Sequence, residues 1–238
     1  MAAGHVRQPR RTQAGTRVMT IDARLAGLVA TFNLRPDRYI DASWLPADWP
    51  LALRDPARYG EAGRAVLARA LLQVHQLQGQ WDYDFAAVEK RIALLPADAL
   101  ERMAVCCGLC LHRQWLREGE VPRKTRQAID LALGAPLVAF ALERMPAFEA
   151  VAETLHAQRQ YPRLAVETLR ARGRRLLTDF LVPFGPAVIR RLALKFPRNA
   201  ADADRPPYLL GRTQRAELGE LLRLSLIPEQ VPAWDWLF

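Results

Sequence analysis

The chain has 238 residues, and its 34 basic against 25 acidic side chains give it a formal charge of +9. Half of the residues are hydrophobic, which excludes a generally disordered chain and allows a substantial core. The longest uncharged stretch in the middle of the chain, residues 131–142, is too short for the roughly 20 apolar residues of a membrane-spanning helix.

The N-terminal segment, residues 1–18, contains four arginines, no acidic residue and no helical or strand periodicity. It is predicted to be a disordered basic tail, and Met19 is an alternative start of translation. No apolar region of signal-peptide length follows the arginines, which disfavours a secretory signal.

The remaining residues, 19–238, are predicted to form a single compact, irregular all-α domain. Strong helix formers dominate the composition, and alternating strand patterns are absent. A first helix at 21–32 ends before an extended Arg-Pro dipeptide, and a turn-rich stretch with several prolines follows it. Amphipathic spacing predicts a second helix from about 56 to 78, and a shorter helix covers 85–95.

The central helix is predicted to begin at Asp98, which would serve as N-cap, with Glu101 completing a capping box. Its middle, residues 103–111, carries no charge and should be surrounded by protein. Gly173 and Gly185 are expected to separate successive helices, and residues 197–208 form the clearest internal loop. The later helices are predicted at 123–133, 136–145, 148–159, 162–172, 174–182, 186–196 and 212–226.

Three cysteines and a histidine in the central helix are candidates for a metal or redox site: Cys106, Cys107, Cys110 and His112. A structural zinc site usually takes two separated pairs of ligands, and no second pair exists in the sequence. Core packing is therefore favoured, because a free cysteine behaves as a small hydrophobic residue. The clustered cysteines also indicate a reducing compartment. No nucleotide-binding or hydrolase motif is present, so neither a catalytic residue nor a cofactor is predicted.

The second basic segment, residues 163–198, holds nine basic and two acidic side chains, whereas the chain outside both basic segments carries 21 basic and 23 acidic ones. Such a segment can contact nucleic acid, an acidic protein or an anionic membrane face. No helix-turn-helix spacing or aromatic stacking ladder accompanies it, so nucleic-acid binding by a basic helical regulator stays the alternative function. The candidate partner surface consists of Arg170, Arg174, Arg175, Arg190 and Arg191.

Four aromatic residues are candidate anchors for a partner protein: Tyr39, Trp44, Trp234 and Trp236. Buried aromatic side chains dominate many protein interfaces. Core packing is the competing interpretation for most of them, because tryptophan is heavily buried on average.

Three segments together resemble the K subunit of bacterial type III secretion systems, the SctK/YscK family. Residues 32–46, FNLRPDRYIDASWLP, are similar to the N-terminal signature of the family. The run CGLCLH at 107–112 and the run LALKFP at 192–197 are similar to two later segments in order and spacing. The resemblance spans roughly residues 32–230, and the basic tail lies outside it.

The resemblance implies a non-enzymatic adapter of the cytoplasmic sorting platform, which supports effector export and virulence. Such a protein would lie in the bacterial cytoplasm at the face of the inner membrane. Its implied partners are the cytoplasmic domain of the inner-membrane ring protein and the Q subunit, with an indirect link to the L stator and the ATPase. The resemblance implies no nucleic-acid partner, and it assigns His112 to helix packing.

Overall fold

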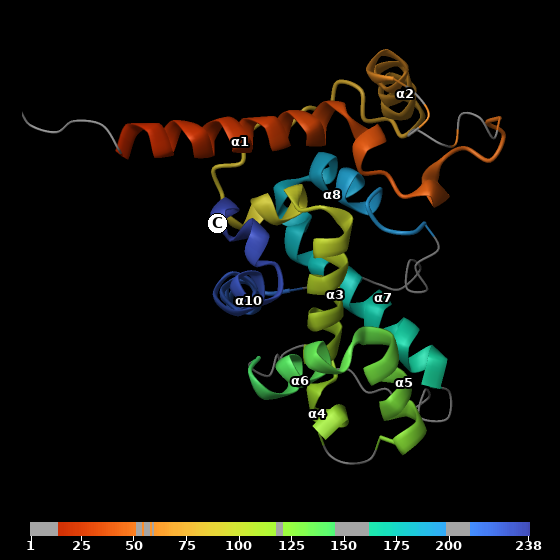
Figure 1. Ribbon diagram of the computed structural model, residues 1–238, viewed down its shortest axis with the longest axis vertical. Helices are drawn as coiled ribbons and strands as arrows, with labels where there is room; N and C mark the ends of the chain where they lie inside the picture. The colour runs from red at the N-terminus through yellow and green to blue at the C-terminus, as the bar shows by residue number, and fades with distance from the viewer. Residues whose placement is uncertain are drawn as a thin grey trace, which may run out of the picture.

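The computed structural model describes residues 14–50, 54, 58, 60–117, 121–145, 162–198 and 210–238, with the backbone alone at 14–22 and 162–163. Within these ranges the regular secondary structure is entirely helical. The predicted all-α class is therefore confirmed, and Figure 1 shows helices of unequal length in an irregular arrangement.

The helices of the described chain differ widely in length. The longest are α1 (Ala14–Leu34), α2 (Glu61–Val74), α3 (Ala97–Leu111) and α7 (Pro162–Leu181). The shorter α-helices are α4 (Arg113–Arg117), α5 (Arg123–Leu133), α6 (Ala135–Glu143), α8 (Pro186–Ala193), α9 (Arg212–Leu221) and α10 (Ile227–Gln230). Short 3-10 helices are η1 (Pro36–Arg38), η2 (Ala42–Trp44), η5 (Glu89–Leu94), η8 (Val182–Phe184) and η10 (Pro232–Leu237), and η9 (Leu222–Leu226) is a π-helical turn.

Helix α3 is the central helix, as its uncharged middle predicted. Every residue from Met103 to Leu111 is buried, because α3 packs against α6, α7 and the η9–α10 region. Figure 1 shows α3 running through the middle of the molecule, with α7 crossing it. Charged side chains are absent from this part of α3 because no side of it faces water.

Glycines allow the backbones of α3 and α7 to contact each other directly. A β-carbon on Gly173 would lie 1.7 Å from the carbonyl oxygen of Ala104, and one on Gly108 would lie 2.0 Å from the carbonyl oxygen of Leu169. The predicted helix break at Gly173 is wrong, since α7 continues unbroken from Pro162 to Leu181. The glycine is required for close packing and does not end a helix.

Helix α1 covers one end of the core with its C-terminal half, where Val29 and Phe32 are buried. Its N-terminal turns extend past the remaining described chain in Figure 1. The helix begins at Ala14, so residues 14–18 of the predicted tail are helical. Residues 1–13 lie outside the described residues.

Residues 36–50 and α2 pack together beside the main core. Their side chains form two small apolar clusters, one around Leu45, Leu67 and Leu71 and the other around Leu72, Leu77 and Leu194. Leu194 follows α8, and its carbonyl oxygen accepts a hydrogen bond of 2.7 Å from the backbone N–H of Asp41. The C-terminal end of α8 therefore connects this layer to the body.

The predicted helix at 85–95 is a 3-10 helix, η5, which starts only at Glu89. The buried side chain of Asn33 holds the residues that precede η5 in a non-helical conformation. Its amide donates to the carbonyl oxygen of Asp82 over 2.7 Å and its oxygen accepts from the Asp82 N–H over 2.9 Å. Asp84 caps no helix, because η5 has Val88 as its N-cap; the Asp84 carboxylate accepts a hydrogen bond from the Ala86 N–H over 3.1 Å in the segment before η5.

The capping box predicted for the central helix is wrong. Pro96 is the N-cap of α3, and Asp98 lies inside the first turn. The side chain of Glu101 does not return to the start of the helix, because it binds Arg174 of α7. The predicted helix at 148–159 lies outside the described residues, as does most of the predicted loop at 197–208.

Candidate partner-binding surfaces

Arg174 was predicted to belong to the candidate partner surface. Its side chain is instead bound to other residues of the fold. Its guanidinium donates two hydrogen bonds to the carboxylate of Glu101, at 2.6 and 2.8 Å, and it lies 5.6 Å from the ring centre of Phe196. Arg170, one turn earlier, donates to the carbonyl oxygen of Ala132 over 2.9 Å, and its side chain is 40% exposed. A two-pronged arginine–carboxylate contact is strong and directional, so Arg174 ties α7 to α3.

Arg175 also has an internal partner. Its Nε lies 3.7 Å from a carboxylate oxygen of Asp179 one turn later, and the two side chains are 14% and 10% exposed. By contrast, Arg190 is exposed on α8. Adjacent residues in a helix point about 100° apart, so the next arginine can point into the protein while Arg190 faces solvent.

Arg191 is fully buried, which contradicts its assignment to a partner surface. Its guanidinium donates over 3.4 Å to the carbonyl oxygens of both Asn33 and Leu77, and over 3.2 Å to that of Ala187. It also lies 6.0 Å from the ring centre of Phe32. Burial lowers the pKa of this guanidinium, because the charge has left water. Arg191 therefore holds α1, α8 and the turn after α2 together.

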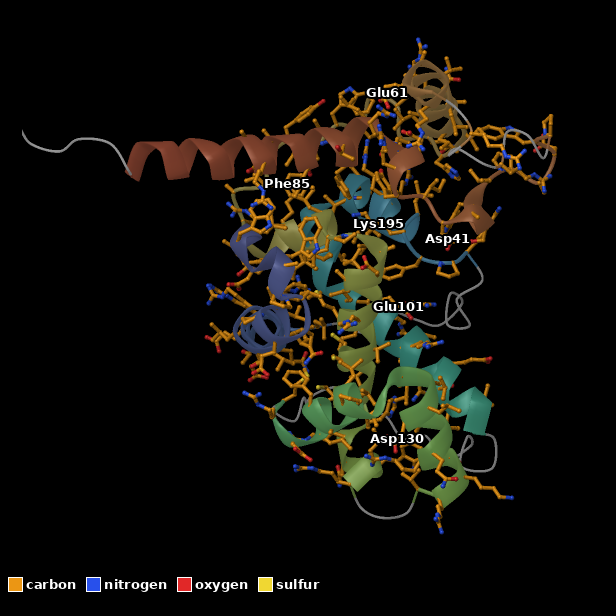
Figure 2. All side chains as sticks on the ribbon, viewed as in Figure 1. Asp41, Glu61, Phe85, Glu101, Asp130 and Lys195 are labelled. Carbon is orange, nitrogen blue, oxygen red and sulfur yellow. The ribbon has the colours of Figure 1, made fainter. Side chains whose placement is uncertain are left out.

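Lys195 is a second buried cation, which sequence reasoning missed. Its Nζ donates to the carbonyl oxygens of Ala93 and Leu95, at 2.7 and 2.6 Å, and faces the rings of Phe32 and Tyr39 at 5.3 and 5.2 Å. Burial lowers the pKa of Lys195 to about 7. Figure 2 shows it below α1, between Phe85 and Asp41. The lysine provides hydrogen-bond donors for the backbone carbonyl groups at the end of η5. No spacing pattern in the sequence indicates this role.

Tyr39 and Trp44 are partly buried and are bound by the body of the protein. The hydroxyl of Tyr39 donates to the carbonyl oxygen of Phe32 over 2.8 Å, and burial raises the pKa of Tyr39. The indole N–H of Trp44 donates to the carbonyl oxygen of Phe196 over 2.7 Å, and its ring meets His75 edge-on at 5.9 Å. Both residues anchor the 36–50 segment to the molecule itself.

Trp234 and Trp236 pack against the main core from the C-terminal end of the chain. Their ring centres lie 6.2 Å apart, and the guanidinium of Arg24 on α1 lies 3.7 Å above the ring of Trp236. A cation over the face of tryptophan is a favourable contact. The pair therefore joins α1 to the C-terminal segment.

These placements change the interpretation of the basic segment. Of the five candidate arginines, Arg190 and Arg170 have the most exposed side chains, while the other three are held by contacts inside the fold. They do not form one continuous strip of exposed guanidinium groups. A nucleic-acid surface requires such a strip to neutralise successive phosphates, so the geometry disfavours it.

The cysteines lie in the main core. Cys106, Cys107 and Cys110 are all buried, and burial raises the pKa of each thiol, that of Cys110 to about 12. His112 is also buried, and its Nε2 lies 3.2 Å from a guanidinium nitrogen of Arg172 on α7. Over the ranges that the structure describes, no three His, Cys, Asp or Glu side chains gather closely enough to hold a metal ion.

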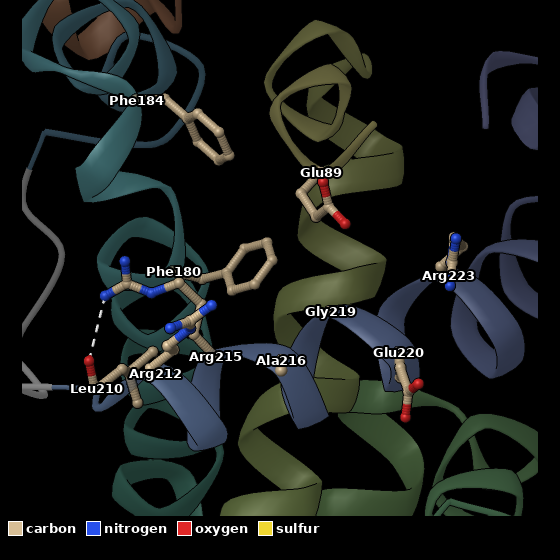
Figure 3. A pocket seen from close by; sticks show the side chains of 10 residues that line it. All are labelled: Glu89, Phe180, Phe184, Leu210, Arg212, Arg215, Ala216, Gly219, Glu220 and Arg223. Atoms are coloured by element: carbon tan, nitrogen blue, oxygen red, sulfur yellow. Dashed lines mark hydrogen bonds between the residues drawn. The ribbon is translucent and has the colours of Figure 1, made fainter. Parts of the chain in front are cut away.

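A half-open cleft of about 600 Å³ lies between α9, η9, the end of α7 and η5 (Figure 3). Its apolar floor consists of Phe180, Phe184 and Leu210. Its charged rim and the rest of its wall consist of Glu89, Arg212, Arg215, Ala216, Gly219, Glu220 and Arg223. The sequence predicted the helix at 212–226, but not that α9 would lie beside Phe180 of α7 and Glu89 of η5.

One comparison with known proteins decides the family. The family model described as "YOP proteins translocation protein K (YscK)" matches residues 28–236. The chain belongs to the YscK family. It is therefore a type III secretion protein, and the resemblance predicted from its three motifs is confirmed. No curated protein and no solved structure matches the chain in the corresponding searches.

The contacts of the motif at residues 107–112 show its physical role in this YscK-family chain. Gly108 allows the backbone of α7 to approach α3, and His112 contacts Arg172 one residue before Gly173. In this YscK-family chain the motif is thus a packing element of the central helix pair. None of the described helices is long and apolar enough to cross a membrane.

Proposed function

We propose that the protein is a non-enzymatic adapter of the type III secretion sorting platform, acting at the cytoplasmic face of the inner membrane. It would link the cytoplasmic domain of the inner-membrane ring protein to the Q subunit, and through Q to the L stator and the ATPase. The observation that carries the proposal is the YscK family match over residues 28–236, which covers nearly all of the described chain.

The chemistry of the buried charged groups supports a binding role over a catalytic one. Lys195 and Arg191 donate to backbone carbonyl oxygens, and Arg174 binds Glu101 between two helices. Each of these contacts joins separate elements of the fold. General acid–base catalysis instead needs such groups to face a pocket that holds a substrate.

A deletion strain tests the proposal in the cell. Removal of the protein should abolish effector export while purified ATPase of the system retains its turnover, because an adapter supplies assembly and no chemistry. Complementation with the wild-type chain should restore export. Normal export by the deletion strain would contradict the proposal.

A further inference from the structure

The cleft of Figure 3 combines an apolar floor with charges that are separated in space. Phe184 provides partly exposed aromatic surface, Phe180 lines the cleft but is only 1% exposed, and Arg212 and Arg215 lie together beside Phe180. Glu220 and Arg223 lie toward the opposite end of the cleft. The cleft is half open, whereas pockets for small molecules enclose most of the ligand surface. The cleft is therefore better suited to a segment of another protein.

Arg215 has unused hydrogen-bonding capacity at this position. One of its terminal nitrogens donates to the carbonyl oxygen of Leu210 over 3.2 Å. Its Nε is buried and has no acceptor among the described residues. A guanidinium carries five N–H donors in a planar fork that matches a carboxylate. Arg212, one turn earlier on α9, is exposed and adds a second cation.

The carboxylates of the cleft restrict what can bind there. Glu89 and Glu220 line the same cleft as the arginines, so a polyanion such as a nucleic-acid backbone would meet repulsion along part of its length. A single carboxylate next to an apolar side chain meets no such repulsion. Its apolar neighbour would cover the exposed part of Phe184, and aromatic side chains that become buried on binding are typical of the centre of an interface.

We infer that this cleft is a docking site for a segment of a partner protein in which an aspartate or glutamate adjoins a large apolar side chain. The carboxylate binds Arg212 and Arg215, and the apolar side chain packs on Phe184. That the segment belongs to a protein of the secretion platform rests on the proposed function. The chemistry of the segment rests on the cleft alone.

The first test uses no platform protein. The full-length chain is used to select from a phage-displayed library of short random peptides, and Ala216→Trp protein serves for counter-selection. Ala216 is an exposed residue of the cleft wall, so a tryptophan there fills the cleft without entering the core. Enriched peptides should pair an acidic with a large apolar residue. No enrichment, or enrichment of sequences without an acidic residue, would overturn the inference.

Variants of the full-length chain then give the size of the effect on an enriched peptide. Ala216→Trp and Arg212→Glu should each raise the Kd about tenfold or more. The matched controls are Ala62→Trp and Arg69→Glu on α2, which are also at exposed positions and should change the Kd by less than about twofold. Equal effects of the cleft and control variants would overturn the inference.

The same four variants are measured against the purified Q subunit and the ring-protein cytoplasmic domain. Weaker binding of one of these proteins to the cleft variants alone would assign the segment to that partner. If the peptides bind the cleft but neither platform protein binds the wild-type chain, the proposed function fails and the docking site stands. If a platform protein binds all variants equally and no peptide is enriched, the docking site fails and the proposed function stands.

Discussion

Gly173 of α7 lies directly against the backbone of Gly108 on α3: a β-carbon on Gly173 would approach the Gly108 amide nitrogen to 2.7 Å and the Ala104 carbonyl oxygen to 1.7 Å. These two helices form the most extensively packed pair in the described core. Their separation is set by backbone contact at this point. Side chains on either side of the crossing can then interdigitate at interior density.

Gly173→Ala should destabilise the protein. Alanine favours an α-helix over glycine by up to about 1 kcal/mol, but here its methyl group would displace the backbone of α3. Overpacking of this kind costs about 1–3 kcal/mol or more, so we expect a net loss that urea unfolding can measure.

Gly27→Ala is the matched control for this glycine. Gly27 lies inside α1, and a β-carbon there would meet no atom within 4 Å. The control should leave the free energy of unfolding unchanged or raise it. Equal effects of the two substitutions would contradict the close approach of α3 and α7.

Truncation of the two adjacent arginines of α8 should have very different effects on the free energy of unfolding. Arg191→Ala removes a buried cation and leaves the carbonyl oxygens of Asn33 and Leu77 without that donor, which should cost about 2–4 kcal/mol. Arg190→Ala, at an exposed position, should change stability by less than about 0.5 kcal/mol. Thermal or urea unfolding of both variants gives the comparison, and similar losses would contradict the burial of Arg191.

The central helix could be predicted from the sequence, whereas the difference between Arg190 and Arg191 could not. An uncharged run such as 103–111 has a single stable location, inside the protein, so its composition alone indicates burial. Two adjacent arginines give no such signal. Which of them is buried depends on carbonyl groups supplied by α1 and by the turn after α2, far away in the sequence.

Gly173 and the cleft of Figure 3 illustrate the same limit. A glycine between helical patterns usually indicates a break, and only the position of α3 shows that this one permits close packing. The cleft requires η5, α7 and α9 to converge, although Glu89 and Arg212 are distant along the chain. Local patterns predicted most of the described helices, but they do not contain the information on how the helices meet.

Lys195 should give the stability of the protein a dependence on pH. Its pKa is about 7 in the folded chain and 10.5 when unperturbed, so between these values the unfolded chain binds more protons. The free energy of unfolding should therefore rise with pH across this window, by at most about 1.4 kcal/mol per pH unit. The cost of burying the charge is fully present below the window and is lost above it.

Lys195→Met isolates this contribution. The variant should show a smaller rise of the free energy of unfolding between pH 7 and 10.5 than the wild-type chain, in urea titrations at several pH values. Only the difference in slope is compared, because loss of the bonds to Ala93 and Leu95 lowers stability at every pH. Parallel curves for the two proteins would contradict titration of this lysine in the window.

The full-length chain should show no appreciable binding of duplex DNA or RNA at moderate salt. Arg174, Arg175 and Arg191 are occupied inside the fold and cannot neutralise phosphates without breaking those contacts. Fluorescence anisotropy of labelled duplexes over a range of salt concentrations measures this. A steep salt dependence that Arg170→Ala, Arg174→Ala and Arg175→Ala reduce would support the alternative of a nucleic-acid-binding regulator.

The most direct test of the adapter function is reconstitution of the bridge from purified components. The cytoplasmic domain of the ring protein and the Q subunit are passed over a size-exclusion column with and without the full-length chain. We predict that the ring domain and the Q subunit elute together only when the chain is present, in one complex that contains all three. Separate elution of the ring domain and the Q subunit in the presence of the chain would contradict the proposed function.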